Sequence, residues 1–426
     1  MKTNRKVIEE LLSGAVFPKM IAVEQVFPRP KVENISLALH QKILRENVRL
    51  LIQPGMKIAI ACGSRGIANL SEIIRTTVEI LRSMDAEPFI VPAMGSHGGA
   101  TAEGQESILK AYGVTEEFCG APIRSSMDVI SIGQLNDGQS IYMDKYAAES
   151  DGIVIVGRIK PHTDFRGPYE SGLMKMLTVG LGKKKGAELF HQQGPQNMAT
   201  NLQTIGNIIL KNAKILFGIG LIENAYDETA RIEVLTSSEI PKNEPDLLID
   251  AWRLMAKCYI QDVDLLIVDK IGKDISGDGM DPNITGRFCN PGVTGGMKIQ
   301  KLAILDITSE SEGQMVGLGY GDVTTRRAFN KCDFEASYPN ALISTTFTPF
   351  RVPIILESDR EAIAACLKYC GNNDKSNPRV IRIQDTMHMG LIWVSEALIP
   401  EVLSNPNMRI FGELENFNFD KMGNLF

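Results

Sequence analysis

The residues whose types suit chemistry concentrate between Gly157 and Gly194. This stretch holds His162 and His191, two of the five histidines of the chain, and it sets Lys175 between two methionines. It also holds seven lysines and arginines, whereas the whole chain has a formal net charge of −6. A local positive field attracts anions more effectively than net charge does. We therefore expect this stretch to bind an anionic small molecule.

Histidine and lysine at these positions would supply proton transfer and nucleophilic attack. His97 lies in the sequence SHGG, where glycines allow close backbone approach and a following helix favours an anion. In KPH, Pro161 fixes the backbone before His162, so His97 and His162 are both candidate site residues. Desolvation of Lys175 would lower its pKa and make its amine nucleophilic. The alternatives are exposed turn histidines, a structural histidine at His191 and a lysine that extends to water.

Two further segments are candidates for ligand binding. The sequence GLGKKKG contains Lys183 and Lys184, but no Ser or Thr follows the lysines as in a phosphate-binding loop. It is either a solvated basic turn or a contact to a cofactor. The polar, glycine-rich loop at residues 273–288 is too long for a simple connector, and it either binds a ligand or only forms Asx turns. Its candidate substrate-binding side chains are Asp281, Asn283 and Arg287.

The elements that must position these residues alternate between strands and helices. Short apolar runs predict strands in the first half of the chain, at residues 57–62, 89–92, 152–156 and 214–219. Their alternation with helices indicates a parallel, doubly wound sheet. Arg65, His97 and His162 each follow one of these strands, and ligands in such folds bind outside the carboxyl ends of strands. We expect these three side chains to lie on one rim of the sheet.

The second half repeats this alternation, so we predict an α/β fold with two α/β domains, mainly parallel sheets, and an active site in the cleft between them. Residues 1–260 would form the N-terminal domain, which carries the cofactor and the catalytic histidines. Residues 261–426 would close over the substrate, and one arrangement of the tail is a return to the N-terminal domain. Helix caps are expected at Asn69, Thr101 and Ser358.

Composition restricts the class of protein. With 426 residues, 44% of them hydrophobic and 23% charged, the chain is typical of a globular protein. Seven cysteines without a CxxC spacing favour a reducing, cytoplasmic setting. No apolar run reaches the roughly 18 residues of a membrane span, and the N-terminus lacks the apolar core of a signal peptide. An acidic chain with 6% aromatic residues is a poor candidate for nucleic-acid binding.

Together these residues resemble the nickel-pincer-nucleotide-dependent lactate racemase family. That family has an arginine loop and then a histidine loop, here Arg65 and His97. A second histidine follows, and then a segment that ends in lysine, here His162 and SGLMK with Lys175. A third histidine lies sixteen residues beyond that lysine, as His191 does here. The resemblance covers about residues 55–195, and the second half of the chain is similar only in outline.

The resemblance implies a cofactor and a reaction. Lys175 would carry, through a thioamide, a pyridinium-3-thioamide-5-thiocarboxylic acid mononucleotide that binds nickel, and His191 would be the protein ligand of the metal. His97 and His162 would be the acid–base pair on opposite sides of the substrate. The hydrogen at C2 of a 2-hydroxy acid would leave as hydride and return to the other face, which makes the chain a racemase or epimerase. Enzymes that make and insert the cofactor would be its partners.

Other basic residues would hold the anionic groups. Arg65 would bind the substrate carboxylate or the cofactor phosphate through a charge-assisted pair of hydrogen bonds. Lys183 and Lys184 would contact the cofactor. The family also has a substrate-binding Gln/Lys pair, for which Lys298 and Lys301 are the candidates here.

The chain departs from the family at three points. Cys62 stands where family members often have an aspartate, and the spacing from His162 to Lys175 is longer than in the lactate enzymes. The loop SGDGMDPNITGR is polar and suits a hydroxylated substrate. We therefore expect a sugar acid, such as an aldonate epimerised at C2, in preference to lactate.

Two other functions remain open from the sequence. A zinc-dependent hydrolase or lyase would use His97, His162 and His191 as three ligands with an open fourth position, although no HxH or HExxH spacing supports it. A non-catalytic protein that binds the nickel cofactor would be expected to lack the acid–base histidines, and both are present.

Overall fold

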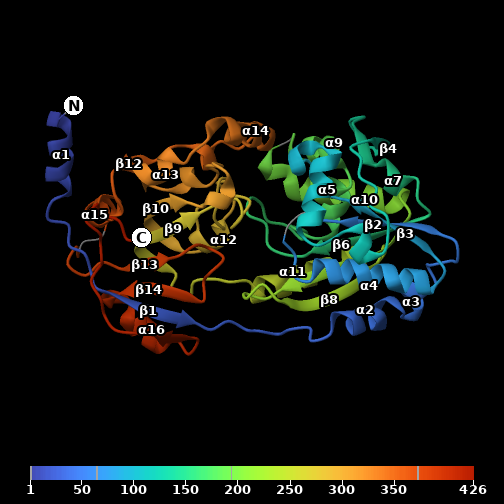
Figure 1. Cartoon of the computed structure of the whole chain (residues 1–426), viewed down its shortest axis with the longest axis horizontal. Helices are drawn as coiled ribbons and strands as arrows, with labels where there is room; N and C mark the ends of the chain where they lie inside the picture. Colours follow the sequence, from blue (N-terminus) through green and yellow to red (C-terminus); the bar gives the residue numbers. More distant parts are fainter. Residues whose placement is uncertain (1, 64–65, 193, 372–373) are drawn as a thin grey trace. The chain divides into compact units, whose positions relative to one another are not determined.

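The computed structural model describes residues 2–63, 66–192, 194–371 and 374–426. Arg65, the predicted anion-binding arginine, lies outside the described residues. The chain forms two compact units (Figure 1). We call Pro28–Met255 the N-terminal unit, and Met1–Phe27 together with Ala256–Phe426 the C-terminal unit. Both are α/β units with mainly parallel sheets, which confirms the predicted fold class.

The N-terminal unit is built on a five-stranded sheet. Its strands are β2 (Lys57–Cys62), β3 (Glu87–Pro92), β6 (Gly152–Arg158), β7 (Ile215–Glu223) and β8 (Thr229–Thr236), and β4 (Val129–Gln134) and β5 (Ser140–Asp144) form a separate hairpin. The sheet order is β3-β2-β6-β7-β8, in which only β8 is antiparallel to its neighbour. The apolar runs of β2, β3 and β6 are buried on both faces, as parallel strands between helices require.

Helices cover both faces of this sheet and make a hydrophobic core on each. One core includes residues of α2 (Ile35–Ile43) and α4 (Leu70–Ser83), and the other includes residues of α8 (Leu173–Lys175), α9 (Lys183–His191), α10 (Met198–Asn212) and α11 (Ile240–Leu254). On α4, the buried residues Ile73, Ile74 and Leu81 recur at helical spacing. The remaining helices of the unit are α3 (Glu46–Arg49), α5 (Ala102–Ala111), α6 (Glu116–Cys119) and α7 (Lys145–Ala148).

Two of the three predicted helix caps are present. Thr101 accepts a hydrogen bond from the Gly104 N–H, and Ser358 accepts one from the Glu361 N–H. The prediction for Asn69 is wrong, because this residue has a left-handed backbone (φ 60°) and its amide donates to Thr229 Oγ1 at 2.9 Å. A left-handed residue does not direct its side chain at the first turn of the helix.

The C-terminal unit is built on an eight-stranded sheet in the order β12-β11-β10-β9-β13-β14-β1-β15. The parallel strands are β9 (Asp262–Ile271), β10 (Lys298–Ile307), β11 (Val323–Thr325), β12 (Ile354–Leu356) and β13 (Val380–Ile383), and the antiparallel ones are β14 (Leu391–Ser395), β1 (Met20–Gln25) and β15 (Met408–Ile410). Its helices are α1 (Lys2–Leu12), α12 (Pro282–Thr285), α13 (Arg326–Asn330), α14 (Phe334–Ser344), α15 (Asp359–Tyr369) and α16 (Ile399–Ser404). No helix in the described ranges has the length and apolar character needed to span a bilayer.

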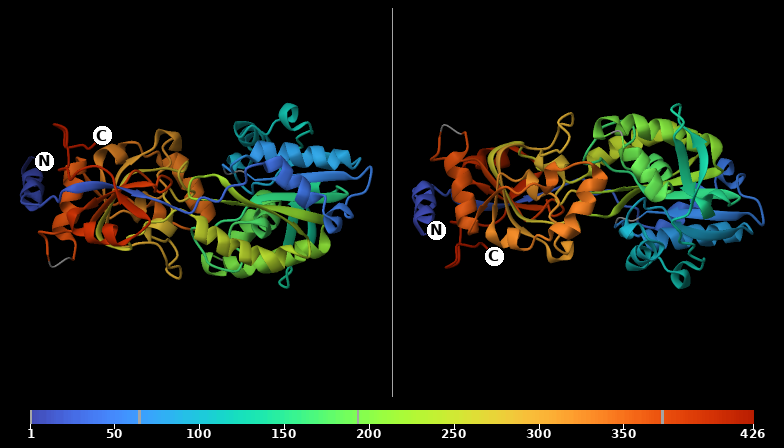
Figure 2. Two further views of the ribbon diagram at one scale, coloured as in Figure 1. Left: turned by 90° about the horizontal axis from the view of Figure 1, so that it is seen from below. Right: turned by 90° about the horizontal axis from the view of Figure 1, so that it is seen from above.

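The first 27 residues differ from the sequence-based domain assignment, because they belong with the C-terminal half of the chain. Strand β1 pairs antiparallel with β14 on one side and with β15 on the other (Figure 2). Phe17, which precedes β1, packs against Phe417 and Phe419 of the tail at centroid distances of 5.7 and 5.4 Å. The boundary predicted near residue 260 lies close to Met255, where the structure divides the chain.

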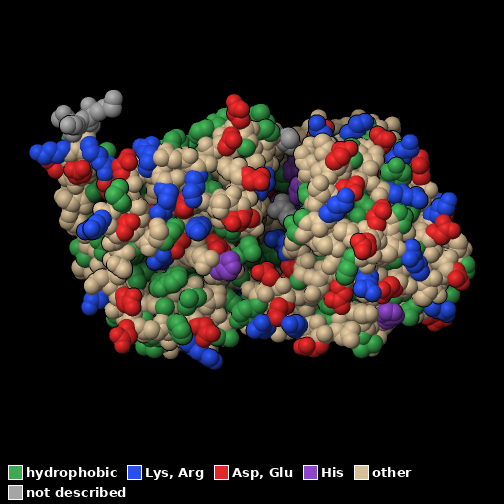
Figure 3. Space-filling view, in the orientation of Figure 1, with side chains coloured by type: hydrophobic (Ala, Val, Ile, Leu, Met, Phe, Trp, Pro, Cys, Tyr) green, Lys and Arg blue, Asp and Glu red, His purple; other side chains and the backbone are tan. Residues whose placement is uncertain are grey.

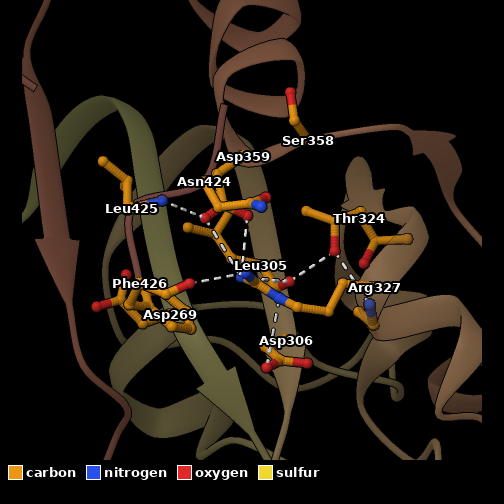
Figure 4. Close-up of polar contacts among 12 residues, drawn as sticks. Asp269, Leu305, Asp306, Thr324, Arg327, Ser358, Asp359, Asn424, Leu425 and Phe426 are labelled. Atoms are coloured by element: carbon orange, nitrogen blue, oxygen red, sulfur yellow. Dashed lines mark hydrogen bonds and ion pairs between the residues drawn. The ribbon is translucent and has the colours of Figure 1, made fainter. Parts of the chain in front are cut away.

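The tail also belongs to the C-terminal unit and does not return to the N-terminal one. The Leu425 N–H donates to the buried carboxylate of Asp359 at 2.8 Å, and Arg327 donates to the Phe426 carbonyl at 3.0 Å (Figure 4). Arg327 also pairs with Asp359 at 3.0 Å and with Asp306 at 3.4 Å. Because the partners of the tail lie on α13 and α15, local sequence patterns could not reveal this attachment.

Candidate active site

His97 lies in the loop that follows β3, as the sequence predicts. Its N–H donates to the Met94 carbonyl at 3.1 Å, and Gly95 before it has a left-handed backbone (φ 60°). Gln105 on α5 is fully buried, and its amide nitrogen donates to the carbonyls of Gly95 at 2.9 Å and His97 at 3.3 Å. His97 is exposed, and the backbone of its loop is held in place by the hydrogen bonds from the buried Gln105 side chain.

Glycine is required where this loop meets α5. A Cβ atom on Gly104 would lie 2.0 Å from the Gly98 carbonyl oxygen, and Gly98 itself has φ 65°. A contact of 2.0 Å is far inside van der Waals distance, so neither residue can be replaced without a shift of the backbone. The glycines of SHGG and the one three residues into α5 therefore set the position of His97.

His162 follows β6 and is held by a network of hydrogen bonds. Its backbone N–H donates to the carboxylate of Glu170 at 2.6 Å, and its carbonyl accepts from Arg166 at 2.6 Å. The N–H of Asp164 donates to Nδ1 of the imidazole at 3.0 Å, and the ring packs on Phe165 at 4.4 Å. Burial raises the pKa of the Glu170 carboxyl. These contacts orient Nε2 of His162 away from its own loop.

Lys175 ends the short helix α8, and its amine meets His162. Nζ of Lys175 lies 2.5 Å from Nε2 of His162. The start of α8 is held by Glu244 of α11, whose carboxylate accepts from the Met174 N–H at 3.1 Å. A Cβ atom on Gly172 would lie 2.0 Å from this carboxylate, so glycine is needed for Glu244 to approach. Burial raises the pKa of Glu244 to about 8.

His191 is the last residue of α9 and has the features of a metal ligand. Burial lowers its pKa to about 4, so the ring is neutral near pH 7. Its Nδ1 is buried and has no hydrogen-bond partner among the described residues. Metal ligation requires a neutral imidazole with an available nitrogen. The site therefore fits the predicted role of His191 toward nickel, and Lys175 is close enough to influence it.

Lys183 does not have the exposure that cofactor binding requires. Its side chain is 0% exposed, and its ammonium donates to the Pro92 carbonyl at 2.5 Å and to Gln105 Oε1 at 3.0 Å. It also forms an ion pair with the buried Asp144 at 3.3 Å. The ammonium thus donates two hydrogen bonds and is also neutralised by the Asp144 carboxylate, so it is fully engaged inside the protein. The expectation for Lys183 is therefore corrected to a structural role, whereas its neighbour Lys184 is exposed.

The basic stretch is largely neutralised by acidic partners. Besides Lys183, ion pairs join Arg158 to Glu223, Arg166 to Glu170 at 3.7 Å, and Lys184 to Glu188 at 4.0 Å. Basic and acidic side chains are also interspersed over the face of the molecule in Figure 3. The local field for anion capture is therefore weaker than the count of basic residues predicts.

The described residues that follow Arg65 are held by hydrogen bonds with other strands of the sheet. Arg158 donates to the Gly66 carbonyl at 3.0 Å, and the Ala68 N–H donates to Glu223 at 2.7 Å. Arg158 is the last residue of β6 and Glu223 is the last residue of β7, while Gly66 and Ala68 follow β2. These hydrogen bonds fix the backbone after residue 65 at this edge of the sheet, and the placement of Arg65 itself stays a prediction because it lies outside the described residues.

The structure separates the predicted substrate-binding residues of the C-terminal unit. Asp281 caps α12 by accepting the Asn283 N–H at 2.9 Å, and both residues follow the carboxyl end of β9. Arg287 instead pairs with Asp322 at 2.9 Å, and Lys298 is the exposed first residue of β10, at the opposite edge of the sheet. Only Asp281 and Asn283 therefore remain together near the edge where ligands of parallel sheets bind.

Sequence reasoning missed the residues that hold this site together. Gln105, Glu170 and Glu244 are all buried and all bind backbone groups of the segments that carry His97, His162 and Lys175. Glu170 lies inside the stretch already selected, but Glu244 is 70 residues from the amide that it binds. Buried carboxyl and amide side chains carry no periodic signal that would have distinguished them from surface residues.

Taken together, a lysine amine, an adjacent histidine and a second histidine with a buried Nδ1 on a parallel α/β sheet are typical of an enzyme that holds a group through lysine or through a metal. Among the described residues, no three or more His, Cys, Asp or Glu side chains group as a metal site, so the three-histidine zinc alternative gains no support. Residues 7–200 match the family described as the lactate racemase N-terminal domain. Over this N-terminal segment the chain is therefore similar to the lactate racemase family, while the rest of the chain lies outside the match.

The matches among solved structures have low sequence identity to this chain. One is the lactate racemase apoprotein from Thermoanaerobacterium thermosaccharolyticum, with 17% identity, a TM-score of 0.43, and coverage of 67% of this chain and 69% of that chain. Another is a protein from Thermotoga maritima, with 13% identity, a TM-score of 0.47, and coverage of 62% and 70%. No curated protein sequence matches this chain.

Proposed function

We propose that this chain inverts C2 of a 2-hydroxy acid with a lysine-tethered nickel-pincer nucleotide. The observation that carries the proposal is the grouping of three residues in the N-terminal unit. Nζ of Lys175 touches the imidazole of His162. Near Lys175, His191 offers a buried nitrogen that has no hydrogen-bond partner among the described residues. These are the three positions that a tethered, metal-binding cofactor would need.

Lys175 would tether the cofactor and His191 would bind its nickel. When bound, this group supplies an acceptor for the hydrogen at C2, which leaves as hydride. Lys184 is exposed and next to the start of α9, so it is the basic side chain proposed for the cofactor phosphate. Lys183 takes no part in binding.

His97 and His162 would move the proton of the substrate hydroxyl. One imidazole would remove this proton while the C2–H bond breaks, and the other would return a proton as the bond re-forms on the opposite face. Gln105 and Glu170 hold the backbones of the two loops by hydrogen bonds. Because both imidazoles are already positioned, little conformational entropy is lost when the substrate reacts. Arg65 is proposed to bind the substrate carboxylate.

The proposed substrate is a 2-hydroxy acid with further hydroxyl groups, such as an aldonate. The support is the polar loop after β9, in which Asp281 and Asn283 stay together at the start of α12. A sugar acid would offer hydroxyl groups for such side chains, whereas lactate has only one hydroxyl. The proposal predicts epimerisation of aldonates at C2 and little turnover of lactate.

The test is intact mass and nickel content of full-length protein made together with the enzymes that synthesise the cofactor. The wild type should gain a covalent adduct and about one nickel per chain. The Lys175→Ala variant should have neither, and the His191→Ala variant should keep the adduct but lose most of the nickel. Unmodified protein that contains zinc would contradict the proposal. The loaded enzyme would then be assayed with D- and L-lactate and with aldonates, and rapid turnover of lactate alone would contradict the sugar-acid assignment.

A further inference from the structure

The hydrogen bonds of His162 determine which of its ring nitrogens carries the proton. The backbone N–H of Asp164 donates to Nδ1 of His162 at 3.0 Å. A backbone amide can only donate, so Nδ1 must be unprotonated. The proton of the neutral imidazole is therefore on Nε2. The doubly protonated form does not fit, because its Nδ1–H would point at the N–H of Asp164.

This assignment has a consequence for Lys175. Nε2 of His162 lies 2.5 Å from Nζ of Lys175, and with a proton on Nε2 the lysine must be the acceptor. An ammonium group has no lone pair and cannot accept, whereas an uncharged amine can. We infer that His162 holds Lys175 as an uncharged, nucleophilic amine, and that it thereby promotes attachment of the cofactor in addition to any role toward the substrate.

The surroundings of Lys175 favour the uncharged form. Lys175 is half-buried, and burial disfavours an ammonium ion. The carboxyl that acts electrostatically on it is Glu170, which already accepts from the His162 N–H and faces Arg166 at 3.7 Å. His191, which also interacts electrostatically with Lys175, is kept neutral by burial and supplies no negative charge. An uncharged Lys175 also removes a positive charge beside the proposed nickel ligand.

The covalent step that follows is balanced without an oxidant or reductant. This step rests on the proposed function, in which the incoming group is a thiocarboxylic acid. Nζ of Lys175 would bond to the thiocarboxyl carbon, the carbon–oxygen bond would break, and the oxygen would leave as water with the proton that nitrogen loses. His162 would pass its Nε2 proton to the leaving oxygen and take the proton from nitrogen, so that the imidazole ends unchanged. A thioamide and one water are the products.

The first test measures the reactivity of Lys175 in the full-length protein before it meets the cofactor. Trace acetic anhydride would be added at pH 7, and acetylation of each lysine would be followed by mass spectrometry. For an ordinary lysine with a pKa of about 10.4, less than about 0.1% of the side chains are in the uncharged amine form at this pH. Lys184, whose side chain is 55% exposed, is the internal standard. We expect Lys175 to react at least about tenfold faster than Lys184, which corresponds to one unit of pKa. Equal or slower reaction would overturn the inference.

A variant pair separates the effect of His162 from that of burial. In His162→Gln, the rate of acetylation at Lys175 should fall about tenfold or more, because the contact that selects the amine is lost. His40→Gln is the matched control, since His40 lies on α2 and bonds the Ser36 carbonyl of its own helix. It should leave the Lys175 rate unchanged. A rate that is the same in His162→Gln and in the wild type would overturn the inference.

The proton on Nε2 can be observed directly in the wild type, without any variant. The chain has only five histidines, so ¹⁵N-labelled histidine gives a spectrum simple enough to assign. At pH 7 we expect the ¹⁵N shifts of His162 to show a protonated Nε2 and an unprotonated Nδ1. A protonated Nδ1 would contradict the inference. If Lys175 is reactive but the protein never acquires nickel, the inference is upheld and the proposed function is refuted. If the protein acquires the cofactor and nickel but Lys175 is unreactive, the proposed function is upheld and the inference is refuted.

Discussion

Glu244 is the residue on which the conformation of the Lys175 segment depends most directly. Its side chain is 1% exposed, and it accepts the Met174 N–H at the first turn of α8. Burial raises its pKa to about 8, so the carboxyl is mostly uncharged at neutral pH. An uncharged carboxyl still accepts a hydrogen bond, and it avoids the cost of a buried charge.

Glu244 should therefore make stability depend on pH. Its pKa is about 8 when folded and about 4.5 when unfolded, so between these values the folded state binds the extra proton. The contribution to stability is complete below about pH 4.5 and is lost as pH rises toward 8, by up to about 1.4 kcal/mol for each pH unit. Glu244→Gln should flatten this dependence in urea unfolding at pH 5.5 and 7.5. The exposed Glu79→Gln is the control, and an equal slope in both variants would contradict the assignment.

Lys183 should prove essential to the fold of the N-terminal unit. Lys183→Met leaves the carboxylate of Asp144 buried without its cation, which costs about 3–5 kcal/mol of unfolding free energy. Adding Asp144→Asn should recover part of this loss, because the uncompensated charge is removed. Urea unfolding measures both effects. Lys184→Met, on the adjacent exposed residue, should change the unfolding free energy by less than about 0.5 kcal/mol. Similar stability of the two single variants would refute the structural role.

The limits of sequence reasoning follow from where each residue finds its partners. The strand at Lys57–Cys62 and the cap at Thr101 were predictable, because apolar runs and caps act on neighbouring residues. Lys183 was misinterpreted because its partners come from the ends of β3 and β5 and from α5. A lysine in a KKK run looks solvated until those three elements are assembled around it. The site histidines were found only because their chemistry is distinctive.

The packing of α5 against the His97 loop can be tested through Gly104. In a helix, Gly→Ala normally stabilises by up to about 1 kcal/mol. Here the new Cβ would lie 2.0 Å from the Gly98 carbonyl, so the steric cost should outweigh the gain. We expect faster hydrogen exchange at residues 95–100 and, in the loaded enzyme, about a hundredfold loss of activity from displacement of His97. Gly390→Ala, with open space around it, is the control. Unchanged exchange in Gly104→Ala would show that the loop adapts.

The two units each have their own sheet and core, although their chain segments interleave. The C-terminal unit is assembled from both ends of the chain, with β1 placed between β14 and β15. Pairing of β1 with residues 391–395 could not be predicted, because local patterns specify a strand but not its neighbour. The catalytic residues proposed here all lie in the N-terminal unit, whereas the polar loop that suggests the substrate lies in the other. Stability effects in each unit should therefore be local.

Arg327 provides the test of this independence. It joins β10, α13, α15 and the tail through Asp306, Asp359 and the Phe426 carbonyl, and Asp359 is 0% exposed. Arg327→Met would leave Asp359 buried without its cation, which should destabilise the C-terminal unit by about 3–5 kcal/mol. Hydrogen exchange in urea, resolved by segment, should show earlier opening of residues 262–426 and of β1. Exchange in β2, β6 and α10 should be unchanged, and Lys183→Met should give the opposite pattern. If either variant accelerated exchange in both units to the same extent, the chain would unfold as one cooperative body.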